Sequence, residues 1–290
     1  MFRQRIATAC ACSIMMAASA TSTNHDLPAY AHASEAFHRA FAAELKGLLG
    51  RLPLRTGDRV LDVACGDGAF SHWLSERTKT NVVALDLQCD WLKRADQNVG
   101  SAEQRDVTAV QASAAQIPFD NDRFDLVWCA QSFRSLADVP AVLREMVRVV
   151  RPGGVVAVLE DDALHQLQLP WPVELELAVR TAELEKWRQA SSKHQGYYIG
   201  RRLVKILTEA GLTGVVDQAA SFVRQAPLDD DARDFLASQL SAMERRVSGH
   251  LAAEAHDELH ELLHAANDYW LDRREFSAVC EVRLAWGYKS

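Results

Sequence analysis

A short apolar segment of this chain runs directly into a glycine-rich turn. Residues 60–70 read Val-Leu-Asp-Val-Ala-Cys-Gly-Asp-Gly-Ala-Phe, and a helical pattern follows without a break. Glycine lets a backbone approach a ligand closely, and the start of a helix offers unpaired N–H groups. The turn around Gly66 and Gly68 therefore predicts a nucleotide-type ligand, bound where a strand passes into a helix.

The acidic residues around this turn discriminate between nucleotide cofactors. Asp62 ends the predicted strand, and Asp67 lies between the glycines, where a dinucleotide would place its pyrophosphate. Two carboxylates repel a pyrophosphate, whereas they attract the ammonium and sulfonium of S-adenosylmethionine. Asp86 follows Gly66 by about twenty residues, the spacing of an acid that binds ribose hydroxyls in either cofactor. Ser71 stands where a dinucleotide fingerprint has its third Gly or Ala, so the residues favour S-adenosylmethionine over NAD.

Apolar runs alternate with helical periods along the chain. The predicted strands are Arg59–Ala64, Asn81–Leu87, Val107–Ser113, Phe124–Cys129, Val155–Glu160, Thr213–Phe222 and Phe276–Trp286. The predicted helices are Ser34–Leu49, Ala69–Arg77, Leu92–Val99, Val139–Val149, Val173–Gln189, Arg201–Ala210 and Asp230–Ala266. Strands that alternate with helices at this spacing predict a mostly parallel, doubly wound sheet with ligands at the carboxyl ends of the strands.

The glycine turn, Asp86 and the Arg-Pro-Gly-Gly turn at 151–154 together resemble the class I S-adenosylmethionine-dependent methyltransferases. The similarity is strongest to the small-molecule branch that includes the ubiquinone and menaquinone biosynthesis enzymes, and it covers roughly residues 30–289. Ala64 replaces the first glycine of the family's acidic-x-Gly-x-Gly-x-Gly loop. The resemblance implies an α/β fold: a Rossmann-like, doubly wound, mostly parallel seven-stranded sheet with an antiparallel last strand. It also implies one domain over residues 29–290, with a helical cap insert at about 228–268.

The resemblance implies a set of residues around S-adenosylmethionine. Ser113 occupies the position where many relatives place an aspartate against the adenine amino group. The cofactor-binding candidates are Asp62, Ala64, Gly66, Gly68, Asp86, Leu87, Ser113, Ala114, Cys129 and Gln131.

Methyl transfer from a sulfonium is an in-line displacement, which requires alignment and exclusion of water more than acid–base groups. An oxygen nucleophile additionally needs a group that accepts its proton. Side chains that follow the fourth and fifth strands should face the sulfonium. The catalytic candidates from these positions are therefore His165 and Arg134. Tyr198 is a third candidate, because its ring and hydroxyl could line the substrate pocket, and Glu160, Asp161, Tyr197 and Trp171 are further residues considered for the pocket.

Composition limits the partners. The formal charge is −7 and no long basic run is present, which argues against nucleic acid as the main partner. The six cysteines show no paired Cys-x-x-Cys pattern, so reduced thiols and no metal site are expected. The sequence has no run of eighteen apolar residues, so no membrane span is expected.

Residues 1–28 are interpreted as a leader or a disordered extension. A cytoplasmic protein with a small-molecule substrate is expected, while export or organelle import, and the oligomeric state, stay open.

Four function hypotheses remain from the sequence. The leading one is transfer of a methyl group from S-adenosylmethionine to a small, partly apolar metabolite. A second keeps the cofactor but has the chain act as a lyase or cyclase that releases methylthioadenosine. A third is a non-catalytic, cofactor-binding regulatory protein. An NAD-linked reductase fits least, because Asp67 stands in the phosphate position.

Overall fold

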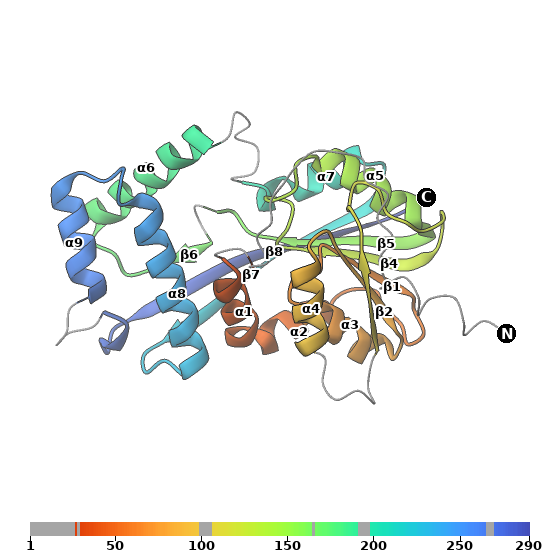
Figure 1. Cartoon of the computed structure of the whole chain (residues 1–290), viewed down its shortest axis with the longest axis horizontal. Helices are drawn as coiled ribbons and strands as arrows, with labels where there is room; N and C mark the ends of the chain where they lie inside the picture. Colours follow the sequence, from red (N-terminus) through yellow and green to blue (C-terminus); the bar gives the residue numbers. More distant parts are fainter. Residues whose placement is uncertain (1–26, 28–29, 99–105, 164–165, 191–197, 265–269) are drawn as a thin grey trace.

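A computed structural model of the chain describes residues 27, 30–98, 106–163, 166–190, 198–264 and 270–290 (Figure 1). The predicted leader, apart from Leu27, lies outside these ranges. His165 and Tyr197 also lie outside them. Within the described ranges, no helix combines the length and the apolarity needed to span a membrane.

A sheet with the order β3-β2-β1-β4-β5-β8-β6 forms the centre of the fold, and β7 pairs with β8. Pairing is parallel from β3 through β5 and antiparallel wherever β8 takes part. This confirms the predicted doubly wound sheet with an antiparallel last strand. The sheet has eight strands instead of seven, because the two-residue β6 also pairs with β8. The strands are β1 Val60–Val63, β2 Val82–Asp86, β3 Val107–Gln111, β4 Phe124–Ala130, β5 Val150–Glu160, β6 Leu167–Gln168, β7 Thr213–Gln225 and β8 Ser277–Tyr288.

Helices cover both faces of this sheet. Figure 1 shows α5 and α7 on one side and α3 on the other, while α6, α8 and α9 gather at the end away from β1 and β2. The α-helices are α1 Ala31–Ala40, α2 Ala42–Leu49, α3 Ala69–Thr78, α4 Cys89–Asn98, α5 Val139–Val149, α6 Val173–Ala190, α7 Leu203–Glu209, α8 Asp230–Val247 and α9 Ala253–His264; short 3-10 turns are η2 Gly200–Arg202 and η3 Trp270–Asp272.

Two of the predicted helices are each divided in two. The segment predicted as one helix from Ser34 to Leu49 breaks at Phe41, whose φ of −120° and ψ of 20° leave the helical region. The predicted helix from Asp230 to Ala266 breaks after Val247 and resumes at Ala253. Both breaks fall within unbroken apolar periods, which is why periodicity alone does not reveal them.

Successive side chains of β4 point alternately into two hydrophobic cores, one on each face of the sheet. Leu126 and Trp128 pack with α1, α2, α3 and α8, whereas Val127 and Cys129 pack with α5 and α7 on the opposite face. Successive side chains of a strand point to opposite faces, so this division follows directly from the strand geometry. The sheet is therefore buried on both sides, as a parallel sheet requires.

The helical segment after β7 packs onto the first helix of the described chain. The Phe235 ring of α8 lies 5.5 Å from Phe37 and 5.2 Å from Phe41, measured between ring centroids. Arg39 of α1 forms ion pairs with Asp231 and Asp234 of α8 at the surface. These contacts hold α1 in place beside the carboxyl ends of the strands, where it forms one wall of the site.

Candidate functional site

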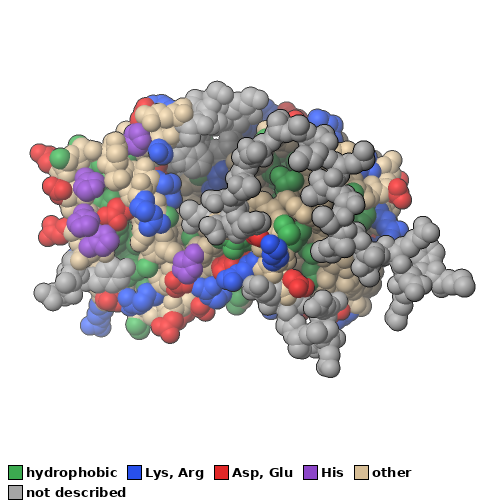
Figure 2. Space-filling view, viewed as in Figure 1, with side chains coloured by type: hydrophobic (Ala, Val, Ile, Leu, Met, Phe, Trp, Pro, Cys, Tyr) green, Lys and Arg blue, Asp and Glu red, His purple; other side chains and the backbone are tan. Residues whose placement is uncertain are grey.

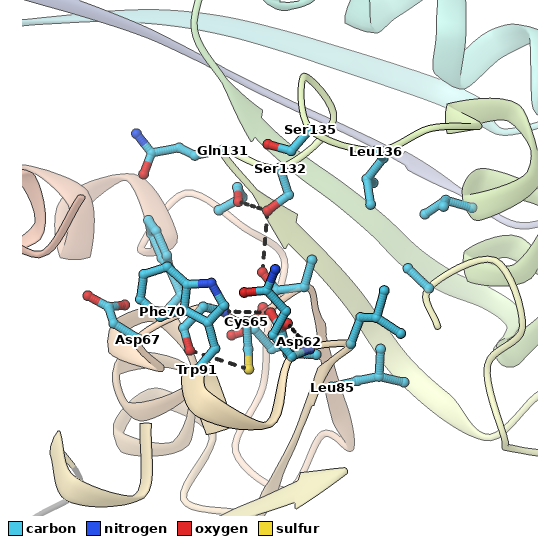
Figure 3. Close-up of a pocket in the computed structure, with 18 of the residues that line it drawn as sticks. Asp62, Cys65, Asp67, Phe70, Leu85, Trp91, Gln131, Ser132, Ser135 and Leu136 are labelled. Carbon is cyan, nitrogen blue, oxygen red and sulfur yellow. Dashed lines mark hydrogen bonds between the residues drawn. The ribbon is translucent and has the colours of Figure 1, made fainter. Parts of the chain in front are cut away.

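A cavity of about 390 Å³ lies at the carboxyl ends of β1, β2 and β4. Its size falls within the range of about 300–1,000 Å³ that is typical of small-molecule sites. In Figure 3, Gln131, Ser132, Ser135 and Leu136, which follow β4, lie across the cavity from the β1 loop. Residues of α1 and α4 complete the wall. This is the edge of a doubly wound sheet at which ligands bind.

The β1 loop has an unusual backbone at three positions. Ala64, Gly66 and Gly68 have φ values of 56°, 53° and 77°, which are in the left-handed region. A Cβ added at Gly66 would have no neighbour within 4 Å, whereas one at Gly68 would lie 2.6 Å from the Cβ of Ala95 in α4. Gly66 thus keeps the loop open toward the cavity, and Gly68 allows α4 to pack against the loop.

Asp86 ends β2 with its carboxylate held by backbone groups. Its Oδ2 accepts a hydrogen bond from the Gly66 N–H at 3.1 Å, and its Oδ1 accepts one from the Gln88 N–H at 2.9 Å. Burial raises the pKa of Asp86, because the charged form loses water. Each oxygen keeps a lone pair that can accept a further hydrogen bond. The carboxylate is therefore oriented for hydroxyl groups in the cavity.

Asp62, at the end of β1, is 2% exposed and accepts a hydrogen bond of 2.5 Å from the Ser71 hydroxyl. Burial, together with the neighbouring carboxylates of Asp67 and Asp86, raises its pKa to about 7. Across the described part of the chain, no Lys or Arg forms an ion pair with Asp62 or Asp86. The cavity is therefore acidic and lacks a strong cation of its own next to these two groups.

The elevated pKa of Asp62 predicts a pH-dependent cost to stability in the ligand-free protein. The ordinary pKa is 3.8 and the folded-state value is about 7, so between these pH values the folded chain binds a proton that the unfolded chain releases. Stability therefore falls as pH rises through this window, by at most about 4 kcal/mol. Asp62→Asn removes the ionisation, so the variant is expected to lose less stability than wild type between pH 5 and pH 8 in urea unfolding. Equal losses in both proteins would contradict this assignment.

His38 of α1 connects the two loops that face each other across the cavity. Its Nδ1 lies 2.8 Å from Oδ2 of Asp67, and its Nε2 lies 3.1 Å from Oε1 of Gln131. Burial lowers the pKa of His38, but the Asp67 carboxylate and the two hydrogen bonds outweigh it, so that the net shift is upward. With an acceptor at each ring nitrogen, both nitrogens can donate when the ring is protonated.

Sequence reasoning missed His38, although a signal was present. Tyr30, Ser34 and His38 are four residues apart, and all three line the cavity. Side chains at this spacing share one face of a helix. The polar side chains at this spacing therefore marked the side of α1 that faces the site. Trp91 of α4 was also missed, and its ring centroid lies 6.3 Å from that of Tyr30.

Most predicted cofactor-binding residues come together in the cavity. Those that line it are Asp62, Ala64, Gly66, Asp86, Leu87, Ser113, Ala114 and Gln131. Gly68 and Cys129 do not belong to the lining. Cys129 is fully buried in the core on the α5 side, because its position in β4 points it away from the face of Trp128. The placement of Cys129 beside a ligand is thus not supported by the strand geometry.

The predicted catalytic residues are not brought together at the cavity. Arg134 forms an ion pair with the buried Asp161 at 2.8 Å, and the Tyr198 ring lies 4.1 Å below the guanidinium of Arg201. Neither Arg134 nor Tyr198 lines the cavity, and His165 is outside the described residues.

The other residues considered for the pocket have structural partners. Glu160 accepts hydrogen bonds from the backbone N–H groups of Ser132 and Phe133 at 2.8 and 2.7 Å, and burial raises its pKa to about 8. This carboxyl group therefore fixes the loop that follows β4. Trp171 packs on Trp270, with 5.1 Å between ring centroids, and belongs to the border of the core.

The matching protein family and the similar curated proteins are all described as methyltransferases. A family described as "Methyltransferase domain" matches residues 61–158, which include β1 through most of β5. The 27-O-demethylrifamycin SV methyltransferase of Amycolatopsis mediterranei is 29% identical over 188 residues, 64% of this chain and 60% of that protein. A demethylmenaquinone methyltransferase of Geobacillus kaustophilus is 29% identical over 58% of this chain and 76% of that protein. Methyltransferase GfsG of Streptomyces halstedii is 36% identical, and the match spans 41% of its length.

Solved structures share this fold over most of the chain. A protein of Bacillus halodurans assigned as a methyltransferase superposes with a TM-score of 0.54 at 25% identity, over 85% of this chain and 99% of that chain. Phosphoethanolamine N-methyltransferase 2 of Haemonchus contortus, solved with S-adenosylhomocysteine, superposes with a TM-score of 0.51 at 17% identity, over 88% of this chain and 57% of that one. At that identity the second likeness concerns the fold alone.

Proposed function

We propose that the chain, whose residues 61–158 match a methyltransferase domain, transfers a methyl group from S-adenosylmethionine to a small-molecule acceptor. The observation that carries this proposal is the pair of buried carboxyl groups, Asp62 and Asp86, on either side of the open loop at Gly66. The match spans less than two thirds of the first curated relatives, so the acceptor is not transferred from them.

The charge of the cavity fits this cofactor. An ammonium or sulfonium beside Asp62 would compensate a carboxylate that the protein leaves without a Lys or Arg partner in the described ranges. A pyrophosphate would instead be placed among Asp62, Asp67 and Asp86, where like charges repel. The NAD-linked alternative is disfavoured for this reason.

The proposed binding roles follow from the groups that each wall presents. Asp86 would accept hydrogen bonds from the ribose hydroxyls, since backbone N–H groups already fix its orientation. Leu87 and Ala114 supply apolar surface for a base. Ser113 accepts a hydrogen bond from the Ala115 N–H at 3.2 Å, which leaves its hydroxyl hydrogen to donate. Ser113 would thereby bind the adenine ring in place of the acid found in many relatives.

The chemical step requires alignment more than proton transfer. The bound cofactor supplies an electrophilic methyl group, and the chain must position the acceptor and exclude water. His38 joins Asp67 to Gln131 and so holds the two sides of the cavity at a set separation. The Tyr30 and Trp91 rings provide electron-rich faces that stabilise positive charge. We assign His38 as a positioning residue, and His165 stays a predicted base.

The net charge of the chain and the source of S-adenosylmethionine bear on the class of acceptor and on the cellular compartment. The net charge of −7 disfavours nucleic acid as the acceptor. We propose a small-molecule acceptor methylated in the cytoplasm, where S-adenosylmethionine is made.

Calorimetry and product analysis test the proposal. The purified full chain is expected to bind S-adenosylmethionine and S-adenosylhomocysteine saturably, and to bind NADH at least about tenfold more weakly because of the acidic cavity. In cell extract with a labelled methyl donor, S-adenosylhomocysteine and a labelled small molecule should accumulate. Methylthioadenosine as the product would favour the lyase or cyclase instead. Binding without turnover would favour the regulatory protein, and absence of binding would refute a cofactor site.

A further inference from the structure

Histidine side chains gather on the surface of the helical segment that follows β7, far from the cavity. Figure 2 shows them together at the end of the molecule formed by α8 and α9. Glu244 of α8 and His260 and His264 of α9 direct one ligand atom each to a common point, and these atoms all lie within 4.8 Å of one another. Together these three described residues offer two imidazole groups and one carboxylate.

The packing of the two helices dictates this arrangement. Leu259 and Leu263 are buried, and His260 and His264 follow them directly, one turn apart at the edge of the buried face. Residues at i and i+4 are neighbours on a helix surface, and the two rings lie 4.4 Å apart between centroids. Glu244 directly follows the buried Met243 in α8, so the apolar contact between the helices brings its carboxylate opposite the histidines.

The distances are close to those of a coordination shell. Nδ1 of His260 lies 3.1 Å from Oε1 of Glu244, and Nε2 of His264 lies 3.0 Å from Oε2. Zinc bonds of about 2.1 Å place two tetrahedral ligand atoms about 3.4 Å apart. Small side-chain rotations therefore suffice to place an ion among the three groups.

We propose that Glu244, His260 and His264 bind one divalent transition-metal ion of the Zn²⁺ type, with water in the remaining position. Imidazole nitrogens favour Zn²⁺ and its neighbours over Mg²⁺ and Ca²⁺, which prefer oxygen ligands. The expectation of no metal rested on cysteine spacing, and this histidine set lies outside that pattern. The ion would tie α9 to α8, and α8 packs on α1, whose Ser34 and His38 line the cavity.

Zinc titration of the tag-free full chain, stripped with a chelator, tests the proposal. A competing chromophoric chelator should report one site that is weakened at least about tenfold in His264→Ala and in His260→Ala. Glu244→Gln should weaken binding as well while preserving the shape of the side chain. Cysteine thiolates are in general zinc ligands, so the difference between the affinity of wild type and that of each variant is the measured quantity.

A matched control is available in α3. His72 lies 3.3 Å from Glu76 in an i, i+4 pair that belongs to no three-residue set among the described residues, so His72→Ala should leave zinc binding unchanged. Zinc should also raise the unfolding temperature of wild type and of His72→Ala but not of His264→Ala, because the ion stabilises only a chain that keeps the site. Circular dichroism checks that each variant is folded. Equal zinc affinity in wild type and the three site variants, or an equal thermal shift, would overturn the proposal.

Discussion

Replacing Asp86 by alanine is expected to weaken S-adenosylmethionine binding at least about hundredfold. Hydrogen bonds to a charged group contribute about 1.5–3 kcal/mol each, and each 1.4 kcal/mol corresponds to tenfold in affinity. The variant loses the proposed bonds to two ribose hydroxyls. It also leaves the Gly66 N–H without its acceptor, which loosens the loop. Calorimetry on wild type and variant measures the change.

Two further variants separate charge from shape. Asp86→Asn keeps an oxygen for the Gly66 N–H but lacks the charge, so its affinity should lie between those of wild type and Asp86→Ala. Asp96→Ala removes an exposed acid from the neighbouring α4 and should bind as wild type does. If Asp86→Ala binds the cofactor as tightly as Asp96→Ala, Asp86 does not contact the ribose.

Replacing Gly68 by alanine is expected to destabilise the fold by roughly 2–5 kcal/mol. The left-handed backbone costs a non-glycine residue about 1–2 kcal/mol, and forced contacts in a packed site cost about 1–3 kcal/mol more. The new Cβ would lie 2.6 Å from the Cβ and 3.1 Å from the Cα of Ala95, so α4 must move away from the loop. Urea unfolding gives the free energy, and the shift of α4 should also reduce cofactor affinity.

Gly66→Ala is the matched control, because its φ of 53° is also left-handed but its Cβ would have free space. It should cost about 1–2 kcal/mol, from the backbone alone. Ala64 occupies the same backbone region at a φ of 56°, which shows that the fold tolerates an alanine there. Equal destabilisation by Gly66→Ala and Gly68→Ala would mean that contact with Ala95 does not decide the effect.

The sheet was largely predictable because its signals are local. The runs that became β1, β2 and β4 are apolar except for one aspartate each, as expected of strands buried on both faces, and intervening helices make their pairing parallel. The order of the last strands came from family resemblance. β6 was missed because two residues carry no periodic signal, and its pairing depends on the length of β8.

The site was predictable where its residues lie next to the ends of predicted strands. Asp62, Gly66 and Asp86 are adjacent to strand ends, so spacing alone indicated their shared edge. His38 is buried between Asp67 and Gln131, which are 29 and 93 residues away along the chain. Cys129 and Arg134 were predicted near the ligand because they are close to the end of β4. Strand alternation places the Cys129 side chain in the core, and Arg134 forms an ion pair with Asp161.

The order of residues along the chain by itself determined the open turn after the first strand, the acids beside it and the alternation of strands and helices. These depend on backbone freedom and on periodicity, which act over a few residues. Tertiary structure alone decided that His38 joins Asp67 to Gln131, that α4 rather than a ligand requires Gly68, and that Glu244 meets two histidines of α9. These outcomes depend on side chains distant in sequence that packing brings within a few ångströms, and no local pattern encodes such distances.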